Sequence, residues 1–375
     1  MEERVLVLQG GGALGAYQAG VYEVLAAREL MPHWVAGISI GAINAALIAG
    51  NPPNRRVERL HAFWDTVTSS LSQWPVPVTP DVKLRSMTND ANAAMGAVFG
   101  LAGFFRPRIP AAPFHAPGTP GALSYYDTEP LRATLEQLVD FDLLNSGTTR
   151  LSVGAVNVGT GNFAYFDSAS QRLDARHIMA SGALPPGFPP VEIDGQWYWD
   201  GGLVSNTPLQ YVLDQPAASR TLAFQVDLFV ADGPIPKDLL QVAEREKDIR
   251  FSSRTRLNTT MSLERHTLAQ AARRVMAKLP PGLADDPDFK ALTAASRSSC
   301  ITVVHLIHRR KQYESQSKDY EFSRTSMLEH WDAGRADMEQ TLDHPDWLRR
   351  ALPDDGVQAF DLTRRARHHS MKVSA

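Results

Sequence analysis

The sequence predicts an α/β fold with a mainly parallel central sheet, and three observations support this prediction. Two short apolar runs near the N-terminus, Val5–Leu8 and Trp34–Ala36, have the length and composition of buried strands. Each run leads into a glycine-built turn and then a helical pattern, as in parallel α/β sheets. Further strand and helix patterns continue to about residue 230, so we expect helices on both faces of the sheet.

The second glycine turn reads Gly-x-Ser-x-Gly, with Ser39 between Gly37 and Gly41. In this motif the serine occupies a sharp strand-to-helix turn and presents its hydroxyl to solvent. Residues Ala42–Ala49 are good helix formers, so a helix N-terminus with free amides lies beside the hydroxyl. The pattern predicts that Ser39 is a nucleophile.

The first glycine turn, which includes Gly15, predicts an oxyanion hole. Its expected donors are the backbone amides of Gly10, Gly11, Gly12 and Ile40. The same turn also matches Gly-x-Gly-x-x-Gly, so a dinucleotide-binding oxidoreductase is an alternative. That site needs an acidic residue at the end of the second strand, where this chain has Ile38 and Ser39, so we favour the oxyanion hole.

Asp200 is the candidate base, because a serine hydroxyl needs a proton acceptor within hydrogen-bond reach. It ends the strand-like run Gln196–Asp200 and precedes Gly201 and Gly202, which permit close backbone approach. Asp-Gly pairs are also common turn signals, but only this one has the doubled glycine. We expect burial among Trp197–Trp199 to raise the pKa of Asp200 above its ordinary value of about 3.9.

The glycine-rich loop, Gly-x-Ser-x-Gly and Asp-Gly-Gly, in this order, resemble the patatin-like phospholipase family. Residues 180–190 and 206–208 are similar to that family too, so the resemblance covers roughly the first 215 residues. It implies a three-layer α/β/α patatin-like fold and a Ser-Asp dyad, Ser39 and Asp200, without histidine. The implied activity is hydrolysis of lipid carboxylic esters through an acyl-enzyme, of phospholipase A, lysophospholipase or esterase type. One departure is Leu14, where family members often carry Arg or Lys.

Two further alternatives are a Ser-Asp-His triad and a non-catalytic lipid-binding protein. His177 or His305 could complete a triad in the chain order of the α/β-hydrolases. The serine turn follows only the second strand here, whereas the α/β-hydrolase turn lies deeper in its sheet, so we favour the dyad. Labelling by a serine-directed probe separates an enzyme from a lipid-binding protein.

The chain divides into a catalytic domain, residues 1–230, and a mainly helical extension, residues 231–375, expected to pack on the core. Within the first part, residues 51–125 are rich in proline and predict a lid or cap over the site. The uncharged segment Ala91–Phe105 is either a buried core helix or an apolar lid that contacts lipid. Other expected elements are helices over Tyr126–Val139, Lys237–Ile249 and Met327–Thr341, and strands over Leu151–Asn157, Gly161–Phe166, Thr221–Val230 and Ile301–Ile307.

Composition and charge limit the classes of partner and the cellular compartment that we expect. The 375 residues carry a net charge of −3, which gives no reason to expect nucleic acid. Cys300 is the only cysteine, and no signal-like segment opens the sequence, so we expect a cytoplasmic protein. A peripheral membrane contact and a homo-oligomer stay open. We expect no cofactor. We also expect no metal, because His305 and His308 face opposite sides of a strand and would not readily share an ion. The basic cluster Arg364–His369 predicts a solvated tail.

Overall fold

The computed structural model describes residues 2–70, 81–215, 220–296, 300–309, 311, 313–350 and 356–363, so the basic cluster lies outside the described residues. Its centre is a nine-stranded sheet of order β11-β10-β9-β1-β2-β5-β8-β7, with β6 paired to β5 outside this path. The strands of this sheet are β1 (Glu3–Leu8), β2 (Trp34–Gly37), β5 (Arg150–Asn157), β6 (Phe163–Asp167), β7 (Val191–Ile193), β8 (Gln196–Asp200), β9 (Arg220–Asp227), β10 (Cys300–Ile307) and β11 (Gly356–Phe360). A separate small sheet pairs β3 (Arg106–Pro107) with β4 (Tyr126–Asp127).

Helices surround this sheet on both sides. They are α1 (Ala16–Ala27), α2 (Ile40–Ala49), α3 (Arg56–Thr68), α4 (Val82–Phe99), α5 (Glu129–Leu138), α6 (Phe141–Asn145), α7 (Ala175–Ser181), α8 (Leu209–Asp214), α9 (Leu239–Met276), α10 (Pro287–Ala295), α11 (Arg324–Asp343) and α12 (Pro345–Leu348). Two 3₁₀ turns, η1 (Gly12–Gly15) and η5 (Gly201–Leu203), lie beside the site described below.

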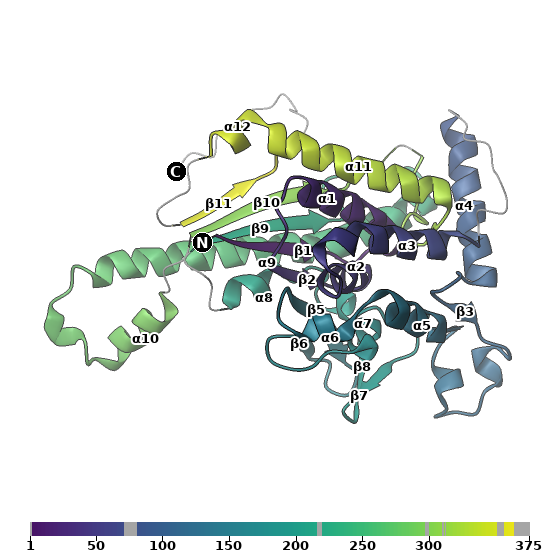
Figure 1. The fold of residues 1–375 in the computed structure, drawn as a ribbon, viewed down its shortest axis with the longest axis horizontal. Coiled ribbons are helices and arrows are strands. Elements are labelled where there is room, and N and C mark those ends of the chain that lie inside the picture. The colour runs from purple at the N-terminus through teal and green to yellow at the C-terminus, as the bar shows by residue number, and fades with distance from the viewer. Residues whose placement is uncertain are drawn as a thin grey trace.

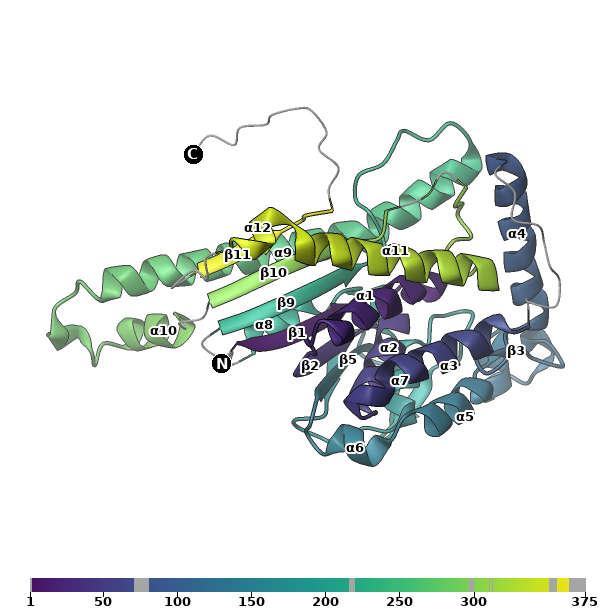
Figure 2. The same cartoon turned by 45° about the horizontal axis from the view of Figure 1, so that its top comes forward.

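The sheet is mainly parallel, as predicted. Strands β11, β10, β9, β1, β2 and β5 run in the same direction, whereas β6 and β8 are antiparallel to β5 and β7 is antiparallel to β8. Helices α1 and α11 cover one face, and α8 and α9 cover the other (Figures 1 and 2). The three-layer α/β/α architecture expected from the sequence is confirmed.

Strand β1 shows why these apolar runs form the centre of the molecule. Its residues Val5, Leu6, Val7 and Leu8 are all fully buried, as is typical of a parallel strand covered on both faces. Because side chains alternate along a strand, Leu6 and Leu8 join the core beneath α1, α2 and α11. Val5 and Val7 instead pack in a second core that includes Leu209 of α8.

The extension after residue 230 contributes more than helices. It adds β10 and β11 to the sheet beside β9, a placement that the sequence did not reveal. Helix α9 is 38 residues long, well beyond the predicted Lys237–Ile249. After Ile249 the sequence is mostly polar, so apolar periodicity gives no signal for the rest of this helix. With α10 it projects past one end of the sheet, opposite α4 (Figure 1).

Helix α11 of the extension packs directly against α1. A Cβ atom added to Gly20 would lie 2.0 Å from the Trp331 carbonyl oxygen, and one added to Gly334 would lie 2.0 Å from that of Tyr17. Only glycine permits so close an approach of two helix backbones. The extension and the N-terminal region therefore share one interior.

The region 51–125 is not a single covering element. Helix α3 is part of the core, where Phe63 and Trp64 are fully buried, and residues 71–80 lie outside the described residues. The apolar segment Ala91–Phe105 divides between α4 and a turn, because the helix ends at Phe99. Most of α4 is exposed, and it stands at one end of the molecule (Figure 2).

Candidate active site

Ser39 occupies the sharp turn between β2 and α2. Its φ of 56° and ψ of −123° are rare for a non-glycine residue, and its backbone amide is held by the Ser181 carbonyl oxygen at 3.1 Å. The two flanking residues must be glycine, because a side chain at either position would clash with neighbouring backbone atoms. A Cβ atom on Gly37 would lie 2.3 Å from the Gly41 oxygen, and one on Gly41 would lie 2.4 Å from the Leu8 oxygen. The surrounding contacts hold the Ser39 backbone in this strained conformation, as is common where strain is retained at a functional site.

The glycine-rich loop after β1 presents free amides beside this serine. The amides of Gly11, Gly12 and Ile40 have no hydrogen-bond partner among the described residues. The Gly10 amide differs, because it donates to the Asn206 carbonyl oxygen at 3.1 Å. Asn206 also donates its side-chain amide to the Gly10 carbonyl at 2.9 Å, so it holds this residue from both sides.

A buried polar network lies beneath the loop. Gln18 donates to the Gln9 carbonyl at 2.7 Å, and Asn44 donates to the Gly15 carbonyl and to the Gln18 side chain, both at 2.9 Å. Trp64 donates in turn to the Asn44 side-chain oxygen at 3.1 Å. Buried polar groups that are satisfied in this way fix one conformation. The network therefore holds the glycine loop and the start of α2 in a constant relation.

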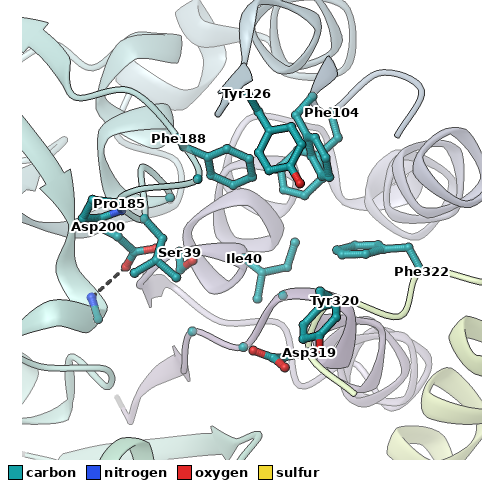
Figure 3. Close-up of a pocket in the computed structure, with 18 of the residues that line it drawn as sticks. Ser39, Ile40, Phe104, Tyr126, Pro185, Phe188, Asp200, Asp319, Tyr320 and Phe322 are labelled. Carbon is teal, nitrogen blue, oxygen red and sulfur yellow. Dashed lines mark hydrogen bonds between the residues drawn. The ribbon is translucent and has the colours of Figure 1, made fainter. Parts of the chain in front are cut away.

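Strand register places Asp200 level with Ser39. Gly37 of β2 pairs with Val153 of β5, and Ala155, two residues further along β5, pairs with Asp200 of β8. Two residues beyond Gly37 is Ser39. The two side chains that the sequence singles out, far apart in the chain, therefore meet in space (Figure 3).

The Asp200 carboxyl group is buried, with 2% of the residue exposed. Burial raises its pKa to about 7, while interaction with the Ser39 hydroxyl and a 2.7 Å hydrogen bond from the Gly202 amide oppose the rise. The expected aromatic shield is wrong for Trp197, which is 42% exposed. Gly202 and Asn206 lie beside the carboxylate, because a Cβ atom on Gly202 would lie 3.1 Å from Asp200 Oδ1 and 3.0 Å from Asn206 Oδ1.

A cavity of about 600 Å³ opens from this pair. Its wall is mainly apolar and aromatic, and the side chains come from elements throughout the chain (Figure 3). Those that shape it include Ile40, Ala97, Phe104, Tyr126, Phe188 and Phe322. No histidine lines it among the described residues. His177 instead contacts Asp174 at the start of α7, and His305 lies 3.9 Å from Asp227.

The extension supplies part of this wall, which the sequence analysis missed. Asp319, Tyr320 and Phe322 line the cavity, and the Asp319 carbonyl accepts a 2.8 Å hydrogen bond from the Ala13 amide. A Cβ atom on Gly12 would lie 1.9 Å from that carbonyl. No local pattern marks these residues, because they act through a contact that spans some 300 positions of the sequence.

Leu14 has no direct part in the site. It is fully buried, belongs to the core beneath α1 and does not line the cavity. An apolar residue therefore suits this position in the present chain.

Comparisons with known proteins bear on the whole arrangement. A family model described as "Patatin-like phospholipase" matches residues 6–213, and one described as "Patatin phospholipase" matches residues 249–354. No curated protein matches significantly. The crystal structure of VipD from Legionella pneumophila is 13% identical, covers 89% of this chain and 67% of its own, and has a TM-score of 0.34, too low to support an argument.

The first of these matches spans more than half of the chain and includes both glycine turns and Asp200. The second reaches into the extension that contributes to the cavity wall. On this evidence of sequence, supported by the observed architecture, the chain belongs to the patatin-like phospholipase family of lipid acyl hydrolases.

Proposed function

We propose that this protein hydrolyses carboxylic esters of lipids with Ser39 as the nucleophile and Asp200 as its base. One observation carries the proposal: hydroxyl, buried carboxylate and unengaged amides converge at the end of an apolar cavity. A carboxylate whose pKa is near 7 is a better proton acceptor for a hydroxyl than one with an ordinary value. The pairing needs no histidine.

The mechanism follows from these positions. Asp200 accepts the Ser39 proton as the hydroxyl oxygen attacks the ester carbonyl, and the tetrahedral oxyanion is bound by the amides of Gly11, Gly12 and Ile40. Gly10 positions the loop, because its own amide is engaged. As the tetrahedral species collapses, Asp200 gives this proton to the leaving alkoxide, which departs as the alcohol and leaves an acyl-serine. The regenerated carboxylate then deprotonates a water molecule that attacks the acyl-serine, and it returns the proton to the Ser39 oxygen as the fatty acid is released.

The wall of the cavity indicates which part of the substrate enters. Among the described lining residues none carries a positive charge, and the acidic members are Asp200 and Asp319. Lys247 lies close by, but it pairs with Asp319 at 2.7 Å. An anionic headgroup therefore finds no partner inside, whereas an acyl chain buries apolar surface there. We propose that the chain enters and the headgroup stays outside.

A peripheral membrane contact belongs to the same proposal. Helix α4 borders the cavity through Ala93 and Ala97, and its exposed face carries Met87, Val98 and Phe99, which are 62–70% exposed. An exposed apolar face on a helix that lines the cavity suits contact with a lipid surface. No helix in the described part of the chain combines the length and apolar character needed to cross a bilayer.

The oxidoreductase alternative fits the glycine loop poorly. A dinucleotide pyrophosphate would need the amides at the start of the helix that follows the loop. The Ala13 amide already donates to Asp319, and the Asp319 side chain lines the same cavity. A phosphate bound there would find the Ala13 amide already engaged and would be repelled by the carboxylate of Asp319.

Labelling with a fluorophosphonate probe tests the proposal. We expect the probe to react with Ser39 in the wild-type protein, and Ser39→Ala to abolish both labelling and ester hydrolysis. Asp200→Asn should lose hydrolysis, because it removes the base. Ser146→Ala, a substitution in a distant exposed loop, is the matched control and should behave as wild type.

Thermal unfolding of each variant separates chemistry from folding. Labelling that persists in a folded Ser39→Ala protein would contradict the proposal. Vesicle binding by a wild-type protein that takes up no label would instead support the non-catalytic lipid-binding alternative.

A further inference from the structure

Three buried side chains of the extension converge on one point, away from the cavity. His308 follows β10, Glu314 lies in the loop after it, and His330 is in α11; each residue is 3–5% exposed. The Glu314 Oε1 atom lies 3.1 Å from His330 Nε2 and 3.4 Å from His308 Nε2. All three donor atoms lie within 4.8 Å of one another.

These separations fit a common metal ligand set. Zinc bonds of about 2.0–2.1 Å in tetrahedral geometry place neighbouring donor atoms about 3.3 Å apart. Two imidazoles and one carboxylate form a recurrent set for divalent transition ions. Two of the donors come from the end of a strand and from a long helix, which hold them in place. The loop carrying Glu314 contributes the third.

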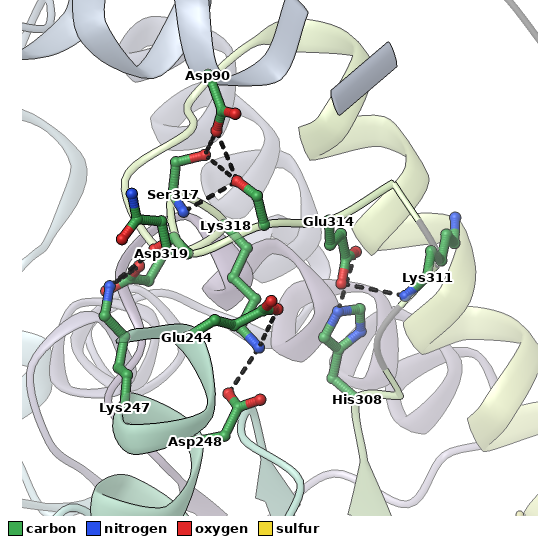
Figure 4. Close-up of polar contacts among 12 residues, drawn as sticks. Asp90, Glu244, Lys247, Asp248, His308, Lys311, Glu314, Ser317, Lys318 and Asp319 are labelled. Carbon is green, nitrogen blue, oxygen red and sulfur yellow. Dashed lines mark hydrogen bonds and ion pairs between the residues drawn. The ribbon is translucent and has the colours of Figure 1, made fainter. Parts of the chain in front are cut away.

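The charges around the cluster also favour a cation (Figure 4). Lys318, which is buried as well, lies 2.6 Å from Asp248 and 3.7 Å from Glu244. The Lys318 ammonium is therefore engaged by two carboxylates other than Glu314. The contacts of Glu314 are with the two imidazoles and, at 3.2 Å, with the Lys311 amide. A cation bound between these side chains would offset the charge of the buried Glu314 carboxylate, which is otherwise costly.

Three of the four ring nitrogens of the cluster have no hydrogen-bond partner among the described residues. They are both nitrogens of His308 and the Nδ1 atom of His330. The fourth, His330 Nε2, contacts Glu314. The His308 Nε2 atom, one of the three clustered donor atoms, is therefore a buried polar atom without a hydrogen-bond partner, as expected of an imidazole that binds a metal.

We propose that His308, Glu314 and His330 bind a divalent transition ion, Zn²⁺ by the chemistry of the donors, with water at the remaining position. From the sequence no metal is expected, because His305 and His308 face opposite sides of a strand. Glu314 and His330 are not candidates there, because they lie apart from His308 in the chain. The fold, not a spacing motif, brings them together.

The ion would fix the loop that borders the cavity. From Glu314 the chain continues to Ser317, whose hydroxyl donates to Asp90 of α4 at 2.6 Å, and then to Asp319, which holds the Ala13 amide. A metal bond at Glu314 would therefore anchor one end of this loop to β10 and α11. The expected role is structural, and its test does not require ester hydrolysis.

The experiment uses the full chain, purified without a histidine tag. Metal content of the purified protein is measured first, and Zn²⁺ is then titrated into chelator-treated protein in competition with a chromophoric chelator. We expect one equivalent of Zn²⁺ per chain and a rise in Tm. His330→Gln and Glu314→Gln should each weaken binding at least about tenfold, since even groups that only support a ligand contribute that much.

His305→Gln is the matched control, because His305 lies on β10, three residues before His308, but outside the cluster. It should bind Zn²⁺ as wild type does. Where a cluster variant fails to fold, the visible spectrum of Co²⁺ bound to wild type decides, since low-symmetry coordination gives intense bands. Wild-type protein that binds no Zn²⁺, or binds it no more tightly than a folded His330→Gln, would overturn the proposal.

Discussion

Asp200 combines burial with a position level with Ser39, and both properties bear on catalysis. Its pKa of about 7 arises because the carboxylate loses water when the chain folds. A base with that value is partly protonated at neutral pH and accepts a proton more readily than an exposed aspartate. Under the proposed mechanism, the residue therefore sets the pH range of the reaction.

Activity should depend on pH through this group. Because the base must be deprotonated, kcat/KM for a soluble short-chain ester should rise with pH and level off above an apparent pKa near 7. At pH 5, two units lower, we expect about one hundredth of the plateau value. A rate profile on folded protein, checked by circular dichroism at each pH, measures this. An acidic limb near pH 4 would contradict the proposed environment of Asp200.

At the scale of elements, the glycine loop and the loop around Asp319 interlock. Gly12 has a φ of +54° and its Cβ position is filled by the Asp319 carbonyl oxygen. Lys247 and Lys318 tie the second loop to α9 through Gln316, Asp319, Glu244 and Asp248. The amides proposed as the oxyanion hole thus depend on an element from the other end of the chain.

Gly12→Ala should disturb both folding and activity. Left-handed backbone alone costs roughly 1–2 kcal/mol with a Cβ atom, and the clash with Asp319 adds to this cost. Gly161→Ala is the control, because its φ is +70° and nothing lies within 4 Å of its Cβ position. Urea unfolding should show a loss at least about 1 kcal/mol larger for Gly12→Ala, with a lower kcat only there. Equal losses in the free energy of unfolding would show that the contact between Gly12 and Asp319 does not contribute to stability.

Helix α4 should influence the preference for acyl chain length. Ala97 lines the cavity, so Ala97→Trp should narrow it and reduce kcat/KM for long-chain esters about tenfold or more relative to butyrate esters. Ala94→Trp places the same bulk on an exposed position of this helix that does not line the cavity, and it should leave the ratio unchanged. Rates over a series of p-nitrophenyl esters provide the ratio. The same loss for all chain lengths would count against acyl binding beside α4.

At the scale of the molecule, the extension completes the sheet and the interior. Strand β10 covers the edge of β9, and α11 lies against α1 through Gly20 and Gly334. Trp331 is 3% exposed in the common core. Residues 1–230 therefore lack part of their own interior when they are separated from the rest.

A chain ending at residue 230 should not fold on its own. It exposes the edge of β9 and the apolar face of α1, so we expect aggregation and no cooperative thermal transition. A chain ending at residue 363 keeps every described element and should unfold like the full protein. Solubility and calorimetry compare the two. A soluble, cooperatively folding 1–230 fragment would show that the extension is an independent addition.

Several features could be predicted from the sequence because they depend on neighbours in the chain. The strand-turn-helix order around Ser39, the glycine loop and the Asp-Gly-Gly turn are local patterns, and they led to the correct architecture and family. The helix Tyr126–Val139 was too long by a few residues, since β4 and α5 share that span. Local patterns locate elements well and their ends less well.

The sequence by itself determined the α/β class, the family and the identity of the paired candidates Ser39 and Asp200. Only the tertiary structure decided that strand register brings these two level, that Asn206 engages the Gly10 amide, and that Asp319 completes the wall. It also decided that His308 meets His330. The physical reason is that apolar periodicity and turn chemistry act over a few residues, whereas register, burial and close backbone contact arise only when distant segments pack together.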